Sequence, residues 1–135
     1  MTPRRSSRGI TWEELRDYAL TLPGVEARTS FGTPALYVKK KFMARLRNDD
    51  LDVLVLKPID DIQQQFLMET QPDVFFKTDH YRGSTAILIR LSNVDPAEIE
   101  ALVDQCWRAL APPKLLAARD GTAPAPPLRR RRRRA

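Results

Sequence analysis

Three stretches of the chain repeat apolar residues at three- and four-residue spacing, which predicts three amphipathic helices. The first begins at Thr11, which forms a capping box with Glu14, and it ends at Pro23-Gly24. Its predicted buried stripe consists of Trp12, Leu15, Tyr18, Ala19 and Leu22.

The second predicted helix has Pro58 in its first turn, and the third is capped by Asp95 with Pro96 at its first position. The third helix is expected to end at Pro112-Pro113. The apolar stripe of the second helix is predicted to be Ile59, Ile62, Phe66 and Leu67, and that of the third Ile99, Leu102, Val103, Cys106 and Leu110.

Extended stretches bounded by turn residues lie between these helices and predict strands. Residues 28–31 form a short extended piece, and strands are expected at 35–39, 42–47, 51–57, 74–77 and 85–91. Short turns favour antiparallel pairing, so the predicted fold is α+β with a mostly antiparallel sheet, in the order α-β-β-β-α-β-β-α. One apolar stripe per helix places the helices on one face, which leaves the other face open to solvent.

The two ends differ in composition from the middle of the chain. Residues 1–9 lack apolar periodicity, and residues 117–135 are rich in Pro and Ala and then in Arg, so both are expected to be disordered. The single folded domain is expected at residues 10–116, which carry 13 Lys and Arg against 16 Asp and Glu. The net charge of +6 therefore arises from the ends, and a basic surface on the domain requires local clustering.

Cellular location and covalent structure follow from simple counts. The one cysteine, Cys106, excludes an internal disulfide. No secretory signal or membrane-spanning run is apparent, so a cytoplasmic location is expected.

Seven short motifs occur in a distinctive order along residues 11–116. They are Leu22-Pro23-Gly24-Val25-Glu26, Phe31-Gly32-Thr33-Pro34-Ala35, Phe42-Met43-Ala44-Arg45-Leu46, Leu54-Val55-Leu56-Lys57, Pro72-Asp73-Val74-Phe75-Phe76, His80-Tyr81-Arg82-Gly83, and Val94-Asp95-Pro96 before a helix with Trp107. Together they resemble the MmcQ/YjbR family. The resemblance implies a CyaY-like or secretion-chaperone-like fold and a DNA-binding role, without a defined set of catalytic or base-reading residues.

A basic cluster on the predicted sheet is the first candidate site. Alternation along residues 42–47 would place Lys41, Met43, Arg45 and Arg47 on the open face, while Phe42, Ala44 and Leu46 face the core. Long cationic side chains on such a face suit phosphates, although lysines also protect strand edges from aggregation. The candidate nucleic-acid-binding residues here are Lys39, Lys40, Lys41, Arg45, Arg47 and Arg90.

The loop His80-Tyr81-Arg82-Gly83 is the second candidate, because Arg82 suits a phosphate and Tyr81 suits a stacked base. Gly83 is expected to allow a positive φ, and the alternative is a purely structural loop. The third candidate is the C-terminal basic run, which attracts any polyanion. It consists of Arg129, Arg130, Arg131, Arg132, Arg133 and Arg134.

Signals for catalysis, metals and cofactors are weak, so no enzymatic activity, metal or cofactor is expected. His80 is the sole histidine, and a nucleophilic pair with Cys106 conflicts with the apolar stripe that carries this cysteine. A CyaY-like shape raises iron binding by carboxylates, but the acidic residues suit helix N-termini better. These are Glu13, Glu14, Asp17, Asp60 and Asp61.

Two functions remain open from the sequence. The first is a non-catalytic DNA-binding module of low sequence specificity. The second is a protein-interaction or chaperone-like module, which exposed Met43 and Tyr37 beside a strand edge would favour. The sequence leaves the oligomeric state undefined.

Overall fold

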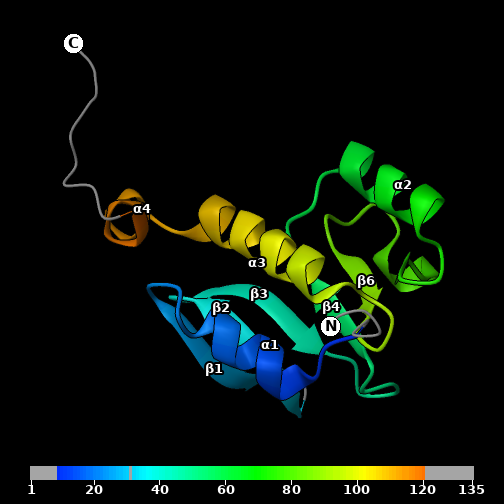
Figure 1. Cartoon of the computed structure of the whole chain (residues 1–135), viewed down its shortest axis with the longest axis horizontal. Coiled ribbons are helices and arrows are strands. Elements are labelled where there is room, and N and C mark those ends of the chain that lie inside the picture. Colours follow the sequence, from blue (N-terminus) through cyan, green and yellow to red (C-terminus); the bar gives the residue numbers. More distant parts are fainter. Residues whose placement is uncertain (1–8, 31, 121–135) are drawn as a thin grey trace, which may run out of the picture.

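The computed structural model describes residues 9–30 and 32–120, which form a sheet with helices packed on it (Figure 1). Within these residues the helices are α1 (Trp12–Ala19), α2 (Asp61–Thr70), α3 (Pro96–Leu110) and α4 (Pro113–Asp120), and a 3-10 helix, η1, spans Asp79–Tyr81. The strands are β1 (Val25–Ser30), β2 (Thr33–Val38), β3 (Lys41–Leu46), β4 (Val53–Leu56), β5 (Phe75–Phe76) and β6 (Ile87–Arg90). They form a six-stranded antiparallel sheet in the order β1-β2-β3-β4-β6-β5, which confirms the predicted α+β class.

Four strands precede α2, whereas three were predicted. The additional strand, β1, includes most of the short extended piece and pairs with β2 from Val25↔Val38 to Ser30↔Thr33. Its sequence is mostly polar because β1 is an edge strand whose residues are largely exposed. Apolar alternation is therefore weak, and this strand was underestimated.

The helix α1 begins as predicted at a capping box. The Glu14 backbone N–H donates to Thr11 Oγ1 at 3.1 Å, and the Thr11 N–H donates to Glu14 Oε1 at 3.0 Å. Leu15 and Ala19 are fully buried in the main core. The cap thus sets the start of α1, and the apolar stripe attaches it to the sheet.

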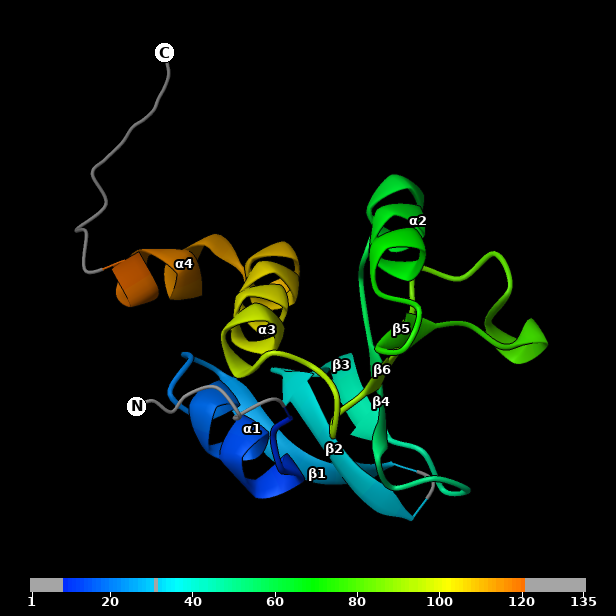
Figure 2. The ribbon, with the colours of Figure 1, turned by 45° about the vertical axis from the view of Figure 1, so that its right-hand side comes forward.

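The helix α3 supplies the largest side chain of the core. Asp95 caps it by accepting from the Ala97 N–H at 3.1 Å. Trp107 is fully buried, and its indole Nε1–H donates to the Pro23 carbonyl at 2.8 Å. This bond ties α3 to the end of the α1 region, and both helices contact the same core cluster on one face of the sheet (Figures 1 and 2).

The helix α2 differs from its predicted stripe. It is capped by Asp60, so Pro58 precedes the helix instead of occupying its first turn. Ile62 and Phe66 are 82% and 62% exposed, whereas Gln64 is 1% exposed. The predicted burial of Ile62 and Phe66 is wrong because Gln64, two positions from each of them, occupies the inward face of the helix through hydrogen bonds.

The Gln64 amide anchors α2 to two separate segments. Its Nε2 donates to the carbonyls of Ile59 and Ser84 at 2.7 and 3.0 Å. Its Oε1 accepts from Lys77 Nζ at 2.8 Å, and Lys77 also donates to the Ser84 carbonyl at 2.8 Å. A buried polar side chain with satisfied hydrogen bonds is compatible with the core, and it overrides the apolar periodicity here.

An irregularity between β2 and β3 changes which side chains face the core. Leu36 pairs with Ala44, but the next residue, Tyr37, pairs with Phe42, so Met43 is the extra residue of a bulge. Met43 is fully buried, and Phe42 is half-buried on the opposite face, where its ring lies edge-on to Tyr37 at 5.7 Å. The predicted placement of Met43 outside and Phe42 inside is therefore wrong.

The second face of the sheet is partly covered rather than open. A small apolar cluster of Val53, Val55, Ala86 and Leu88 lies on it, and Phe76 and Tyr81 pack against this cluster. Tyr81 comes from η1, so the segment between β5 and β6 shields one part of the face. The expectation of an uncovered face holds only beside this segment.

The helix α4 continues the ordered chain past the expected domain boundary at residue 116. The helix α3 ends at Leu110 with Ala111 as its C-cap, and Pro113 is the first residue of α4, a position that suits proline because an N–H there would have no acceptor within the helix. In Figures 1 and 2, α4 and α2 lie at opposite ends of the molecule. Most of the segment expected to be disordered, including the run of arginines, lies outside the described residues.

Candidate nucleic-acid interface

The three consecutive lysines occupy the turn between β2 and β3, which we call the lysine turn (Lys39, Lys40 and Lys41). All three are exposed. Lys39 has a φ of 58°, and its N–H donates to the Gly24 carbonyl at 2.9 Å, which fixes the turn. Among the described residues, no ion pair involves these three ammonium groups.

Arg45 and Arg47 lie away from the lysine turn. Because strand residues rise about 3.3 Å each, Arg47 is roughly 20 Å along the chain from Lys41. Arg47 forms two hydrogen bonds with the Asp49 carboxylate, at 2.8 and 2.7 Å. Arg45 is half-buried and donates to Tyr81 Oη at 3.1 Å and to Asn48 Oδ1 at 3.2 Å. The predicted single cluster is therefore divided between the two ends of β3.

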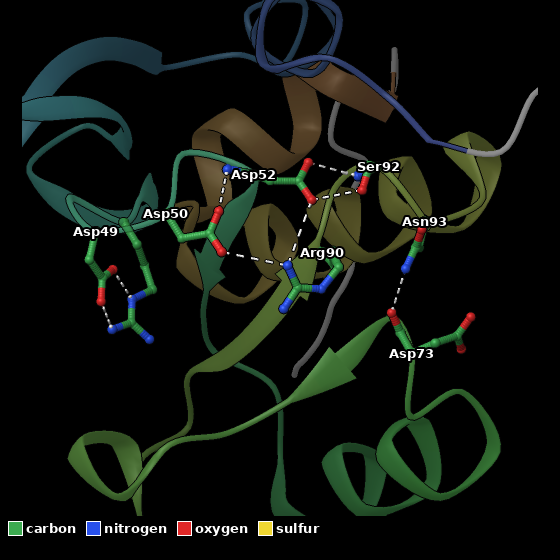
Figure 3. A network of polar contacts seen from close by, with 8 residues as sticks. Asp49, Asp50, Asp52, Asp73, Arg90, Ser92 and Asn93 are labelled. Atoms are coloured by element: carbon green, nitrogen blue, oxygen red, sulfur yellow. Dashed lines mark hydrogen bonds and ion pairs between the residues drawn. The ribbon is translucent and has the colours of Figure 1, made fainter.

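Arg90 lies among carboxylates, as Figure 3 shows. Its Nη1 is 3.5 Å from Asp50 Oδ2 and 3.9 Å from Asp52 Oδ2, and its guanidinium stacks 5.3 Å from the centre of the Phe76 ring. Asp52 also accepts from the N–H and the hydroxyl of Ser92, at 3.0 and 2.7 Å. Around Arg47 and Arg90, three carboxylates face two guanidiniums, so this end of the sheet lacks a positive excess.

The loop after β5 fits its structural alternative more closely than phosphate recognition. Arg82 pairs with Asp79 at 2.6 Å, with both side chains largely exposed. Tyr81 packs on the second-face cluster, and the exposed His80 ring lies edge-on to it at 4.9 Å. Gly83 has a φ of 78°, as expected. The loop thus serves to cover the sheet, and its cation is neutralised locally.

The lysine turn lies beside the start of α4. A Cβ atom on Gly24 would clash with Leu115 Cδ1 and would lie 3.7 Å from Lys39 Cε, so these three residues are close neighbours. A groove of about 370 Å³ next to the turn has an apolar floor that includes Val38 and Leu110. The start of α4 is therefore adjacent to the lysine turn.

Two basic residues near this end were absent from the sequence prediction. Lys114 is exposed in the first turn of α4. Arg28 on β1 donates to Glu26 at 2.6 and 3.1 Å, and its guanidinium lies 5.2 Å from the Tyr37 ring centre. The hydrogen bond from Arg28 is the main cause that lowers the pKa of Glu26, followed by the charge of Arg28, and the charge of Lys39 adds to the effect. The Glu-x-Arg spacing, which places both side chains on one strand face, was a signal for this pair.

Cys106 and His80 are not brought together. Cys106 is buried in the core under the helices, and His80 is exposed on the loop that covers the other face. Burial raises the pKa of the Cys106 thiol to about 12, so it is a neutral thiol at physiological pH. The geometry thus gives no support to nucleophilic chemistry by this pair.

The predicted acidic residues have structural positions. Glu14 completes the α1 cap, and Asp60 caps α2 by accepting from the Gln63 N–H at 2.8 Å. In residues 9–30 and 32–120, no group of three or more His, Cys, Asp or Glu side chains is arranged to hold a metal ion. The same residues contain no helix with the length and apolar character that a membrane span requires.

Comparison with known proteins gives relatives over much of the domain. The chain is 30% identical over 67 residues to the uncharacterized proteins Mb2600 of Mycobacterium bovis and Rv2570 of Mycobacterium tuberculosis. This alignment covers 50% of the chain, and the chain spans about half (52%) of the length of these curated relatives. The family model YjbR matches residues 20–109, which include every strand and the helices α2 and α3 almost completely. The chain therefore belongs to the YjbR family, as its ordered motifs predicted.

Proposed function

We propose that the chain is a non-catalytic DNA-binding module that contacts the phosphate backbone through the lysine turn and the basic C-terminal run. The observation that carries this proposal is the lysine turn itself, where three consecutive exposed cations form no ion pair among the described residues, although the charge of Lys39 also acts on the Glu26 carboxylate. Such cations keep their full charge for an external phosphate, whereas a cation bound to a carboxylate must first lose that partner.

The position of α4 adds to this argument. Leu115 of α4 packs over Gly24 next to Lys39. The preceding residue of the same helix, Lys114, is exposed. The arginines at 129–134 follow α4 in the chain, so they are tethered to the end of the molecule that carries the lysine turn. Tethering raises the effective concentration of a second cationic segment near the same polyanion. Contacts of this kind bind backbone phosphates and give low sequence specificity.

This proposal replaces the sheet face with the lysine turn as the contact surface. Arg47, Arg82 and Arg90 each lie within ion-pair distance of a carboxylate, and Arg45 is engaged with Tyr81 and Asn48. These four arginines therefore are not assigned to DNA in the proposed mode. A cytoplasmic location remains part of the proposal.

The test compares two charge-matched variants of the full chain by fluorescence anisotropy on a labelled DNA duplex. In the first, Lys39→Asn, Lys40→Gln and Lys41→Gln remove the lysine turn, with Asn at 39 because it tolerates a positive φ. We expect affinity to fall about tenfold or more, since three phosphate contacts are lost. The control variant removes three exposed, carboxylate-paired cations through Arg16→Gln, Arg82→Gln and Arg108→Gln.

We expect the control variant to bind within about twofold of the unchanged chain, because none of these three arginines is a proposed DNA contact. Equal losses in both variants would mean that DNA responds to net charge alone. The lysine turn would then lose its assigned role.

A protein-interaction module is the second candidate function. In the structure it is supported by other residues than those that the sequence predicted. Met43 is buried, so the pair Met43 and Tyr37 no longer favours it. Ile62 and Phe66 are instead exposed one turn apart on α2. Recovery of a stoichiometric protein partner after nuclease treatment, and its loss in the variant Ile62→Gln with Phe66→Gln, would favour this function over DNA binding.

A further inference from the structure

A pocket of about 360 Å³ lies on the second face of the sheet, between β2, β3, β4 and the segment that contains η1. Its volume is at the lower end of the range for small-molecule sites. The pocket is separate from the lysine turn, since none of Lys39, Lys40 and Lys41 lines it. An inference from this pocket is therefore independent of the proposed DNA contact.

Aromatic rings from two parts of the chain line the pocket. Tyr37 and Phe42 come from the sheet and form an edge-to-face pair with ring centres 5.7 Å apart. Tyr81 and His80 come from η1 and form a second pair at 4.9 Å. Each of Tyr37, Phe42 and Tyr81 is half-buried, so part of each ring remains accessible. Such walls favour a flat aromatic guest by stacking or edge contacts.

The bulge in β3 is what builds this wall. Without it, strict alternation from Ala44 would turn Phe42 toward the core and Met43 toward the pocket. With it, Phe42 is opposite Tyr37, and Met43 fills the core. The floor is completed by the buried Val55 and Ala86.

The charge of the pocket differs from that of the surrounding surface. Arg45 and Lys57 both line it, and its described lining residues include no carboxylate. The ammonium group of Lys57, which is half-buried, has no hydrogen-bond or ion-pair partner among the described residues. Arg45 is held in place by its bond to Tyr81 Oη at 3.1 Å. The pocket thus combines an apolar, aromatic lining with a positive charge.

We propose that this pocket binds a small planar aromatic anion, such as an aromatic carboxylate. The ring packs against Phe42 and Tyr37, and the anionic group accepts hydrogen bonds from Lys57. Arg45 adds a second positive charge to the lining, which also includes Ser30 and Ser84. Hydrogen bonds from a cation to an anion in a half-buried site are among the stronger polar contacts in proteins.

The test uses fluorine NMR with the full chain and 4-fluorobenzoate as the probe. We expect saturable binding, and we expect the neutral isostere 4-fluorobenzamide to bind about tenfold more weakly or not at all. The substitution Lys57→Gln should weaken 4-fluorobenzoate by about tenfold or more. The control Arg16→Gln removes one positive charge outside the pocket and should change the affinity less than about twofold.

The proposal would be overturned by the absence of saturable 4-fluorobenzoate binding, by equal binding of the benzamide, or by equal effects of Lys57→Gln and Arg16→Gln. The benzamide comparison needs no variant, so it decides the outcome even if Lys57→Gln does not fold. Acetate, added as a competitor, should displace the probe only at far higher concentration, because it lacks a ring. Displacement by acetate and benzoate at the same concentration would also contradict the assigned aromatic contact.

Discussion

Four arginines of the described region lie within three residues of the carboxylate that they bind. The pairs are Arg16–Asp17, Arg28–Glu26, Arg47–Asp49 and Arg82–Asp79. The lysines of the lysine turn have no acidic neighbour in sequence between Glu26 and Asp49. Local sequence therefore separates the cations available to a phosphate from those already neutralised, even though exposed pairs contribute little to stability.

Cys106 gives a prediction at the same scale. Burial raises the pKa of its thiol in the folded state to about 12, whereas the thiol of the unfolded chain has its ordinary pKa of about 9.0. Between these values the folded chain binds more protons than the unfolded chain, so the free energy of unfolding falls as pH rises. The contribution is complete below about pH 9 and decreases by up to about 1.4 kcal/mol per pH unit above it.

Urea unfolding at several values between pH 8 and 11 checks this prediction. The variant Cys106→Ala removes the thiol but keeps every lysine and tyrosine that titrates in the same range. We expect the unfolding free energy of the unchanged chain to fall more steeply with pH than that of the variant. Parallel pH profiles would show that the thiol is hydrated in the folded state.

At the scale of elements, the clearest departure from the sequence pattern is α2. Ile62 and Phe66 carry the helical apolar periodicity, yet Gln64 is the buried residue. Its amide nitrogen donates to the carbonyls of Ile59, before the helix, and of Ser84. Its amide oxygen accepts a hydrogen bond from Lys77. A polar residue that satisfies three partners thus determines the orientation of α2.

Replacing Gln64 by Met therefore tests the anchoring of α2. The substitution leaves Lys77 without one of its acceptors and the Ile59 carbonyl without its donor, while the Ser84 carbonyl keeps only the bond from Lys77. We expect thermal or urea unfolding to show a loss of about 1–3 kcal/mol. The control Gln65→Met, at an exposed position of the same helix, should lie within about 0.5 kcal/mol of the unchanged chain. A Gln64→Met chain as stable as the control would show that the hydrogen bonds contribute no net stability.

The sequence predicted correctly those features that are set by residues close together in the chain, such as the helix caps. The Thr11–Glu14 capping box and the Asp95 cap appear in the structure because both act within three residues. The faces of Met43 and Phe42 were wrong because a single bulge reverses the alternation before it. The partner of Arg90 was not predictable, since Asp50 and Asp52 reach it from another segment through the tertiary fold.

At the scale of the whole molecule, the basic groups divide between two ends. The lysine turn and α4 lie together at one end, and the network of Arg47, Arg90 and three aspartates lies at the other end of β3. The described domain has more acidic than basic residues, so its field alone does not attract a polyanion. In the proposed mode, a polyanion therefore approaches the end of the described domain that carries the lysine turn.

The salt dependence of DNA binding tests this arrangement most directly. The slope of log K against log salt concentration counts the phosphates contacted, at about 0.9 per contact on duplex DNA. For the full chain, we predict that replacing Lys39, Lys40 and Lys41 lowers the magnitude of this slope by about two to three, while the control lacking Arg16, Arg82 and Arg108 keeps it. Identical slopes for the unchanged chain and the lysine-turn variant would contradict the account.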